Sequence, residues 1–138
     1  MVKVISGIAL DGHRRLLMVR KKGIWILPGG KIETGESELI CLIREIKEEL
    51  PRAQLRWFAE GKEFFGQAPF GNHSIAVKTH FIEISGCIEV ANEIEAAEFV
   101  NAKQIGNYPM SQVMADVVAH LIFEGKFLSR QKINMRFL

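Results

Sequence analysis

Short apolar segments separated by turn residues occupy the start of the chain, and this pattern predicts three β-strands. Residues 2–10 are mostly apolar and β-favouring, and Asp11-Gly12 follows them as a hairpin turn signal. Residues 15–20 then fit the returning strand, and residues 24–27 form a third, shorter strand.

Two later segments carry apolar side chains at helical spacing. On a helix over residues 37–50, which turns about 100° per residue, one narrow apolar face predicts the side that meets the core. That face carries Leu39, Ile43, Ile46 and Leu50, with Leu42 at its edge. A second helix is predicted over residues 111–123, with Ser111 as its N-cap and Gly125 as its C-terminal stop. Its apolar positions are Val113, Val117, Val118, Leu121 and Ile122.

The segments between the two helices complete the prediction of the fold. Residues 54–66 and 74–85 are predicted as an antiparallel strand pair joined by the loop QAPFGNH, and residues 98–100 as a last short strand. Three strands, a helix, three strands and a helix imply a mixed sheet with helices packed on it, an α+β or three-layer arrangement. The length of 138 residues predicts one domain over residues 1–138.

The composition excludes several classes of protein. Apolar residues make up 48% and charged residues 25%, and the net charge of +2 is too mild to favour nucleic acid or a membrane surface as a partner. The longest aliphatic or Cys run, residues 39–43, is far below the about 18 residues that span a bilayer. The N-terminus shows no secretory signal pattern.

The cysteines and histidines argue against a zinc site and a disulfide framework. Cys41 and Cys87 are far apart and form no C-x-x-C pair, and the four histidines are scattered. This usage favours a reducing, cytoplasmic setting.

Residues 28–50, PGGKIETGESELICLIREIKEEL, gather many acids beside a glycine turn. Glu45, Glu48 and Glu49 share a helix face beside the apolar stripe, where they repel one another and where the helix dipole disfavours anions. A cation would offset this cost, and Mg²⁺ prefers such hard oxygen ligands, to which a carbonyl of the Gly29-Gly30 turn can add another. The alternative is a solvated acidic face on which Arg44 pairs with Glu48.

The spacing of this segment resembles the box of the Nudix family, hydrolases of nucleoside diphosphates linked to another moiety. The family pattern is G-x5-E-x7-R-E-U-x-E-E-x-G-U, in which U is apolar. This sequence matches it at Gly30, Glu36, Arg44, Glu45, Ile46, Glu48 and Glu49. It departs at the end of the box, where Pro51-Arg52 replaces the glycine and the apolar residue, so the helix exit is expected to differ.

The resemblance implies a Nudix-type α/β/α sandwich and a Mg²⁺-dependent pyrophosphohydrolase, with Mn²⁺ as an alternative cation. It assigns metal binding to Glu45, Glu48 and Glu49, with the Gly29 carbonyl as a further ligand. The base that activates the attacking water would be Glu49 or an acid outside the box. Glu36 and Arg44 would form a supporting ion pair.

Further site residues are expected outside the box. Glu98 resembles a downstream acid that completes the metal site in some members, and Glu93 and Glu95 are its competitors. Arg20 and Lys21 would hold substrate phosphate beside Gly30, unless they are simply exposed charges. Candidate base-stacking aromatics, each of which can equally be a core residue, are Trp25, Phe64, Phe65 and Phe70.

The substrate implied is a nucleoside triphosphate or another nucleoside diphosphate derivative, and the second choice is an ADP-sugar such as ADP-ribose. A different class, a Nudix domain that senses a ligand or binds protein without catalysis, is permitted by Pro51-Arg52. A homodimer is an open alternative, because the C-terminal segment KFLSRQKINMRFL can cover its own core or that of a second copy.

Overall fold

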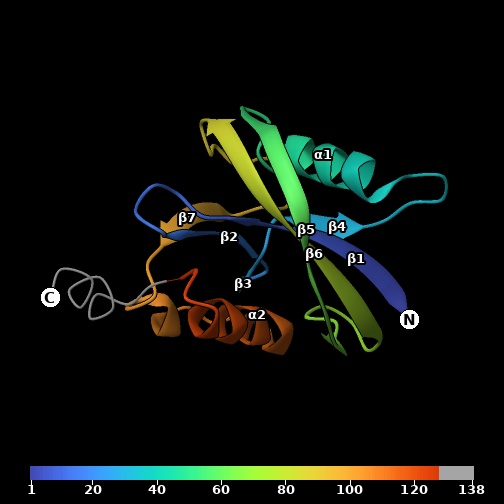
Figure 1. Cartoon of the computed structure of the whole chain (residues 1–138). Helices are drawn as coiled ribbons and strands as arrows, with labels where there is room; N and C mark the ends of the chain where they lie inside the picture. Colours follow the sequence, from blue (N-terminus) through green and yellow to red (C-terminus); the bar gives the residue numbers. More distant parts are fainter. Residues whose placement is uncertain (128–138) are drawn as a thin grey trace, which may run out of the picture.

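A computed structural model describes residues 1–127, which form an α+β fold with two α-helices and a mixed sheet (Figure 1). This confirms the predicted fold class. The elements in chain order are β1 (Val2–Ala9), β2 (Leu16–Lys21), β3 (Ile24–Ile26), β4 (Gly29–Lys31), α1 (Glu38–Glu49), β5 (Ala53–Gln67), β6 (Ser74–Gly86), β7 (Ala96–Val100), the 3₁₀-helix η1 (Ile105–Asn107) and α2 (Gln112–Phe123).

The strands divide into two sheets. The first has the order β4-β1-β6-β5, in which β1 runs parallel to β6 over eight residues and β5 is antiparallel to β6 as predicted. The second sheet, β3-β2-β7, is antiparallel. β4, which pairs antiparallel with β1, was expected to be only a glycine turn.

The predicted hairpin between the first two strands is wrong. β1 and β2 belong to different sheets, and a single bridge between Leu10 and Leu16 joins their ends. The turn itself exists, because Asp11 Oδ1 accepts hydrogen bonds from the backbone N–H groups of His13 and Arg15. It redirects the chain into the second sheet, so a local turn signal did not determine which strands pair.

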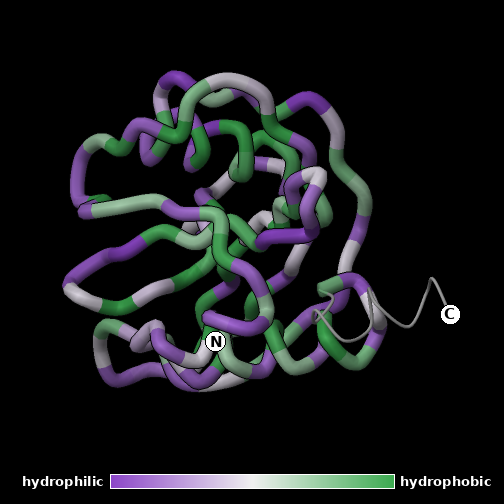
Figure 2. Tube along the Cα trace, turned by 90° about the vertical axis from the view of Figure 1, so that its left-hand side faces the viewer, coloured by the Kyte–Doolittle hydropathy of each residue, from purple (hydrophilic) through white to green (hydrophobic). Residues whose placement is uncertain are grey.

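The two helices lie on opposite sides of the strands and define two hydrophobic clusters (Figure 1). The α1 cluster includes Leu42, Ile46 and Leu50, and the α2 cluster includes Val117 and Leu121. Hydrophobic stretches run through the middle of the molecule, and hydrophilic stretches mark outer loops (Figure 2). The arrangement is the layered sandwich expected for helices that each bury one face.

The helix ends agree with the sequence, but part of the predicted apolar faces does not. Ser37 caps α1 and Ser111 caps α2 through hydrogen bonds from backbone N–H groups three residues on. Ile43 and Ile122, both predicted to be buried, are 41% and 39% exposed. Leu42, expected at the edge of the stripe, is fully buried. α1 is rotated because its acidic side also faces inward, toward the cavity described below.

The remaining differences are small. β7 begins two residues earlier than predicted, and Gly125 ends the second helix with a positive φ of 74°. No helix in the described part of the chain is long and apolar enough to cross a membrane. Apart from Lys126 and Phe127, the C-terminal segment considered as a core or partner cover lies outside the described residues.

Candidate active site

A cavity of about 600 Å³ lies where the C-terminal half of α1 meets β4, the β5–β6 loop and α2. One part of its lining is acidic and comprises Glu33, Glu45, Glu48, Glu49 and Glu93. Another part is apolar and includes Ile75, Val77, Val113, Met114 and Val117. The cavity therefore joins a carboxylate cluster to an apolar compartment, although the two sets come from distant parts of the sequence.

Two glycines let the acids of α1 approach β4. Gly29 has a φ of 145° and packs so closely against the backbone of Ile5 that a Cβ there would overlap the Ile5 carbonyl oxygen. Its N–H donates a hydrogen bond to Glu49 Oε1 over 3.0 Å. At Gly30, a Cβ would overlap the Glu45 carboxylate. A larger residue at Gly29 would push β4 away from β1, and one at Gly30 would displace the Glu45 carboxylate.

Glu49 is the most buried acid of the cavity, with only 5% of its surface exposed. Burial raises its pKa to about 8, and the nearby charges of Glu45 and Glu93 act in the same direction, while the Gly29 N–H opposes them. Burial also raises the pKa of Glu45. Both acids are therefore in surroundings that disfavour their charge unless a cation compensates it.

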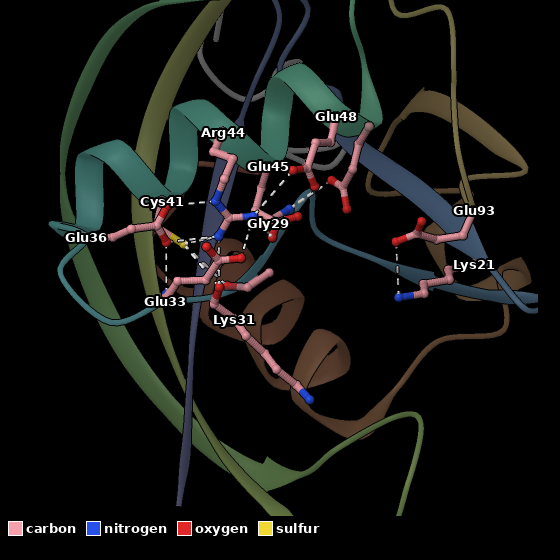
Figure 3. A network of polar contacts seen from close by, with 12 residues as sticks. Lys21, Gly29, Lys31, Glu33, Glu36, Cys41, Arg44, Glu45, Glu48 and Glu93 are labelled. Atoms are coloured by element: carbon pink, nitrogen blue, oxygen red, sulfur yellow. Dashed lines mark hydrogen bonds and ion pairs between the residues drawn. The ribbon is translucent and has the colours of Figure 1, made fainter.

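Arg44 organises the side of the cavity next to the loop after β4 (Figure 3). It forms a bidentate ion pair with Glu36, in which Nε lies 2.6 Å from Oε2 and Nη2 lies 2.9 Å from Oε1. Its Nη2 also donates to the Lys31 carbonyl over 3.1 Å, and Nη1 donates to Glu45 Oε1 over 2.8 Å. Hydrogen bonding to Arg44 lowers the pKa of Glu36 to about 2, so this acid is a permanent anion.

The expected Glu36–Arg44 ion pair is thus present. The alternative pairing of Arg44 with Glu48 is present as well, at 3.6 Å and more exposed to solvent. One guanidinium therefore contacts three of the acids in the box, and it partly neutralises them.

The cavity acids match a hard divalent cation in their chemistry, because all their donors are carboxylate oxygens. Glu49 is the most buried of these acids, and burial destabilises its anionic form, so a nearby cation would stabilise it. In residues 1–127, however, no three acidic, His or Cys side chains are already gathered as a metal cluster. Arg44 engages Oε1 of Glu45 and the Gly29 N–H engages Oε1 of Glu49, so the residue types fit the cation while one oxygen of each acid is bound within the protein.

Of the two side chains predicted to bind phosphate, only one lines the cavity. Lys21 lines the cavity, and its Nζ lies 3.5 Å from Glu93 Oε1. Arg20 lies outside the lining, paired with Glu95 at 3.1 Å and placed over the Trp25 ring. Lys31, which the sequence analysis missed, lines the cavity, and its side chain points away from Arg44 and toward α2 in Figure 3. Its position directly after Gly30 was the available signal.

The acids downstream of the box also separate. Glu98 accepts a hydrogen bond from the Tyr108 hydroxyl and does not line the cavity. Glu95 accepts hydrogen bonds from Arg20 Nε and the Gly23 N–H. Glu93 lines the cavity opposite the acids of α1 (Figure 3). Of the three, Glu93 is therefore the one in contact with the site.

The candidate stacking aromatics divide in the same way. Trp25 and Phe64 are buried in the core, and Phe65 is 59% exposed outside the cavity lining. Phe70 lines the cavity from the β5–β6 loop, with Lys21 Nζ 5.5 Å from its ring centroid. Two further polar lining residues, His73 and Ser111, had no recognisable signal in the sequence.

The comparisons with known proteins identify the family and the fold. The family model described as the NUDIX domain matches residues 2–121. The MutT NUDIX hydrolase from Burkholderia pseudomallei has a similar structure, with a TM-score of 0.75 at 19% identity, over 86% of this chain and 95% of that chain. The MutT protein from Methanosarcina mazei Go1 gives a TM-score of 0.74 at 15% identity, over 91% of this chain and 95% of that chain.

An ADP-ribose pyrophosphatase from Streptococcus suis gives a TM-score of 0.62 at 15% identity, over 86% of this chain and 87% of that chain. No curated protein matches the sequence significantly. At these identities the structural likeness concerns the fold, and the family model carries the assignment. The chain belongs to the Nudix family.

Proposed function

We propose that the protein is a Mg²⁺-dependent pyrophosphohydrolase that cleaves the diphosphate bridge of a nucleoside triphosphate or another nucleoside diphosphate derivative. The observation that carries the proposal is the cavity itself, in which the acids of the box share one space with an apolar compartment. The acidic part suits a cation and the phosphates, and the apolar part suits the nucleoside.

Glu45, Glu48 and Glu49 would hold the cation, with the Gly29 carbonyl as a further ligand and Mn²⁺ as a substitute for Mg²⁺. When bound, the cation supplies charge neutralisation and polarisation of the phosphoryl oxygens. We assign the acid outside the box to Glu93 in preference to Glu98, because Glu93 lines the cavity and Glu98 is engaged with Tyr108.

Glu49 is our candidate for the general base. Its Oε1 accepts the Gly29 N–H, which leaves Oε2 to take a proton from the attacking water. With a pKa of about 8 in the metal-free protein it is mostly protonated at pH 7, so it would act as a base once a bound cation lowers that pKa.

Lys21 and Lys31 would bind the phosphates. Gly30 has no side chain beside the Glu45 carboxylate, so the phosphates would be able to approach the acids. Of the four candidate stacking aromatics, Phe70 alone lines the cavity, so we propose that Phe70 stacks on the nucleobase of the substrate. Lys21 contacts both Glu93 and Phe70, and this position would suit a cation that binds the phosphates next to the nucleobase.

The test is product analysis on a panel of ordinary and oxidised nucleoside triphosphates, ADP-ribose, other nucleotide sugars and dinucleoside polyphosphates, with and without Mg²⁺. The variant is Glu48→Gln, and the matched control is Glu63→Gln, an exposed acid of β5 outside the cavity. We expect turnover that needs both Mg²⁺ and Glu48 and that Glu63→Gln leaves unchanged.

The same panel separates the alternatives. A preference for ADP-ribose would assign the ADP-sugar subclass, and binding of nucleotide without turnover of any compound would replace the enzyme with a sensing module. Glu93→Gln and Glu98→Gln form a second matched pair, in which only the first is expected to raise the Mg²⁺ concentration needed for half-maximal turnover.

A further inference from the structure

The end of α1 is where this chain departs from its family, and the structure shows what replaces the missing glycine. The last helical bond runs from the Leu50 N–H to the Ile46 carbonyl over 2.8 Å. Pro51 has no N–H to continue the series. The Ala53 N–H then bonds to Leu50 rather than to Glu49. The carbonyls of the last turn, which include those of two cavity acids, must find partners elsewhere.

A loop distant in sequence supplies those partners. Asn92 Nδ2 donates to the Glu48 carbonyl over 2.7 Å, and the Ala91 N–H donates to the Glu49 carbonyl over 3.1 Å. The two carbonyls therefore belong to residues whose side chains line the cavity. The loop between β6 and β7 closes the helix end that Pro51 leaves open.

This loop also carries Glu93, the acid that faces α1. The Ile94 N–H bonds to the Ala91 carbonyl over 3.2 Å, which makes a turn with Asn92 and Glu93 at its centre. Asn92 adopts a φ of 57°, a left-handed conformation that Asn tolerates better than most residues. Ile94 is buried in the α1 cluster, so the turn is fixed on one side by the core and on the other by the helix end.

Repulsion between the cavity acids explains why the β6–β7 loop needs a fixed attachment to α1. Glu93 shares the cavity with Glu45, Glu48 and Glu49, so four carboxylates line one space and repel one another. Lys21 offsets the charge of Glu93 only partly, at 3.5 Å. Without a fixed attachment, repulsion would favour conformations in which the loop moves away from α1, and binding of a cation would then have to restore the arrangement.

We infer that Asn92 is a positioning residue of the cation site, which holds Glu93 and the end of α1 together before the cation binds. The inference rests on the proposed function, because it assumes that these acids bind a divalent cation. Asn92 would thus stabilise the C-terminal end of α1, which in the family pattern is followed by a glycine and here by Pro51.

The test uses Mn²⁺ as the probe and measures its binding to the full-length protein by electron paramagnetic resonance. Asn92→Gly permits the left-handed conformation and removes the side chain that donates to the Glu48 carbonyl. The matched control is Asn101→Gly, which removes the hydrogen bond from the Gln104 N–H to Asn101 Oδ1, away from the cavity lining. We expect Asn92→Gly to weaken Mn²⁺ binding about tenfold, as loss of a supporting hydrogen bond does at other metal sites, and the control to leave it unchanged.

A second readout separates positioning from general damage. Saturating metal should restore the turnover of Asn92→Gly to that of the unmutated protein, because the bound cation itself holds the acids together. Because a bound cation also stabilises a merely destabilised protein, thermal melting without metal must show in addition that Asn92→Gly is folded at the assay temperature. Should Asn92→Gly fail to fold, Asn92→Asp serves instead, since it keeps the shape of the side chain, tolerates the same conformation and lacks the donor. Its added negative charge would by itself attract Mn²⁺, so weaker binding in this variant would support the positioning role, and equal or tighter binding would overturn it.

The outcomes distinguish this inference from the proposed function. Equal Mn²⁺ binding by Asn92→Gly and the unmutated protein, with loss of binding in Glu48→Gln, would overturn the role of Asn92 alone. Absence of Mn²⁺ binding in the unmutated protein would overturn both.

Discussion

Arg44 and Glu36 form a bidentate ion pair that joins α1 to the loop after β4, with atoms 2.6 and 2.9 Å apart. The same guanidinium contacts Glu45 and the carbonyl of Lys31. The planar fork of an arginine can satisfy these partners together, whereas a lysine offers a single charged nitrogen. This geometry fixes the position of the acids relative to the strand that faces them.

Arg44→Lys is therefore expected to lower kcat/KM about tenfold or more, because misplaced catalytic groups lose rate steeply. Steady-state kinetics at saturating Mg²⁺ measures this. Arg56→Lys is the matched control, since Arg56 is exposed on β5 and donates only to Gln54. Full activity in Arg44→Lys would show that charge alone suffices at this position.

Gly30→Ala is expected to reduce turnover to a similar extent, about tenfold, because its Cβ would overlap the Glu45 carboxylate and displace it. Gly106→Ala provides the control, since a Cβ at Gly106 meets no atom within 4 Å. Kinetics and thermal melting of both variants would decide. A fully active Gly30→Ala enzyme would mean that Glu45 can move without consequence.

The raised pKa of Glu49 predicts how the stability of the metal-free protein depends on pH. The native carboxyl has a pKa of about 8 and the ordinary value is 4.5, so between these values the native state binds a proton that the unfolded state has released. The free energy of unfolding should therefore fall as pH rises through this window, by at most about 1.4 kcal/mol per pH unit for one proton. Urea unfolding in the presence of a chelator measures this slope.

Glu49→Gln should flatten that slope, because the amide keeps its charge state at every pH. Glu45 also has a raised pKa, so part of the slope is expected to remain in the variant. Glu63→Gln should leave the whole slope in place. An unchanged slope in Glu49→Gln would mean that Glu49 is ionised in the metal-free protein throughout this range.

Glu98 and Tyr108 allow a test that is independent of catalysis. The hydrogen bond to Glu98 raises the pKa of Tyr108, which is the only tyrosine of the chain. Glu98→Gln should therefore lower the pKa of Tyr108 toward its ordinary value, which spectrophotometric titration of the tyrosine detects directly. The same variant should bind Mn²⁺ like the unmutated protein. A loss of Mn²⁺ binding would restore Glu98 to the cation site.

Features that depend on residues close together in the chain could be predicted before the fold was known. The bounds of both helices followed from Ser37, Ser111 and Gly125, because caps act on backbone groups within one turn. The box placed Glu36 and Arg44 eight residues apart, and their ion pair formed across one loop and two turns of helix. The antiparallel β5–β6 pair followed from a short loop between two long strands.

Contacts between segments that are distant in the sequence could be found only in the folded structure. β1 and β2 lie in different sheets, because β1 pairs in parallel with β6. A local turn signal does not determine that pairing. α1 is rotated so that Ile43 faces solvent, because the helix packs its acidic side against the glycines of β4.

The same packing selected Glu93 over Glu98 as the acid in the cavity and brought Asn92 to the end of α1. Residues 92–98 carry three glutamates, and the sequence pattern favoured Glu98, which does not line the cavity. Their positions depend on burial of Ile94 and on hydrogen bonds to α1 and to the β2–β3 turn, which exist only once the chain has folded.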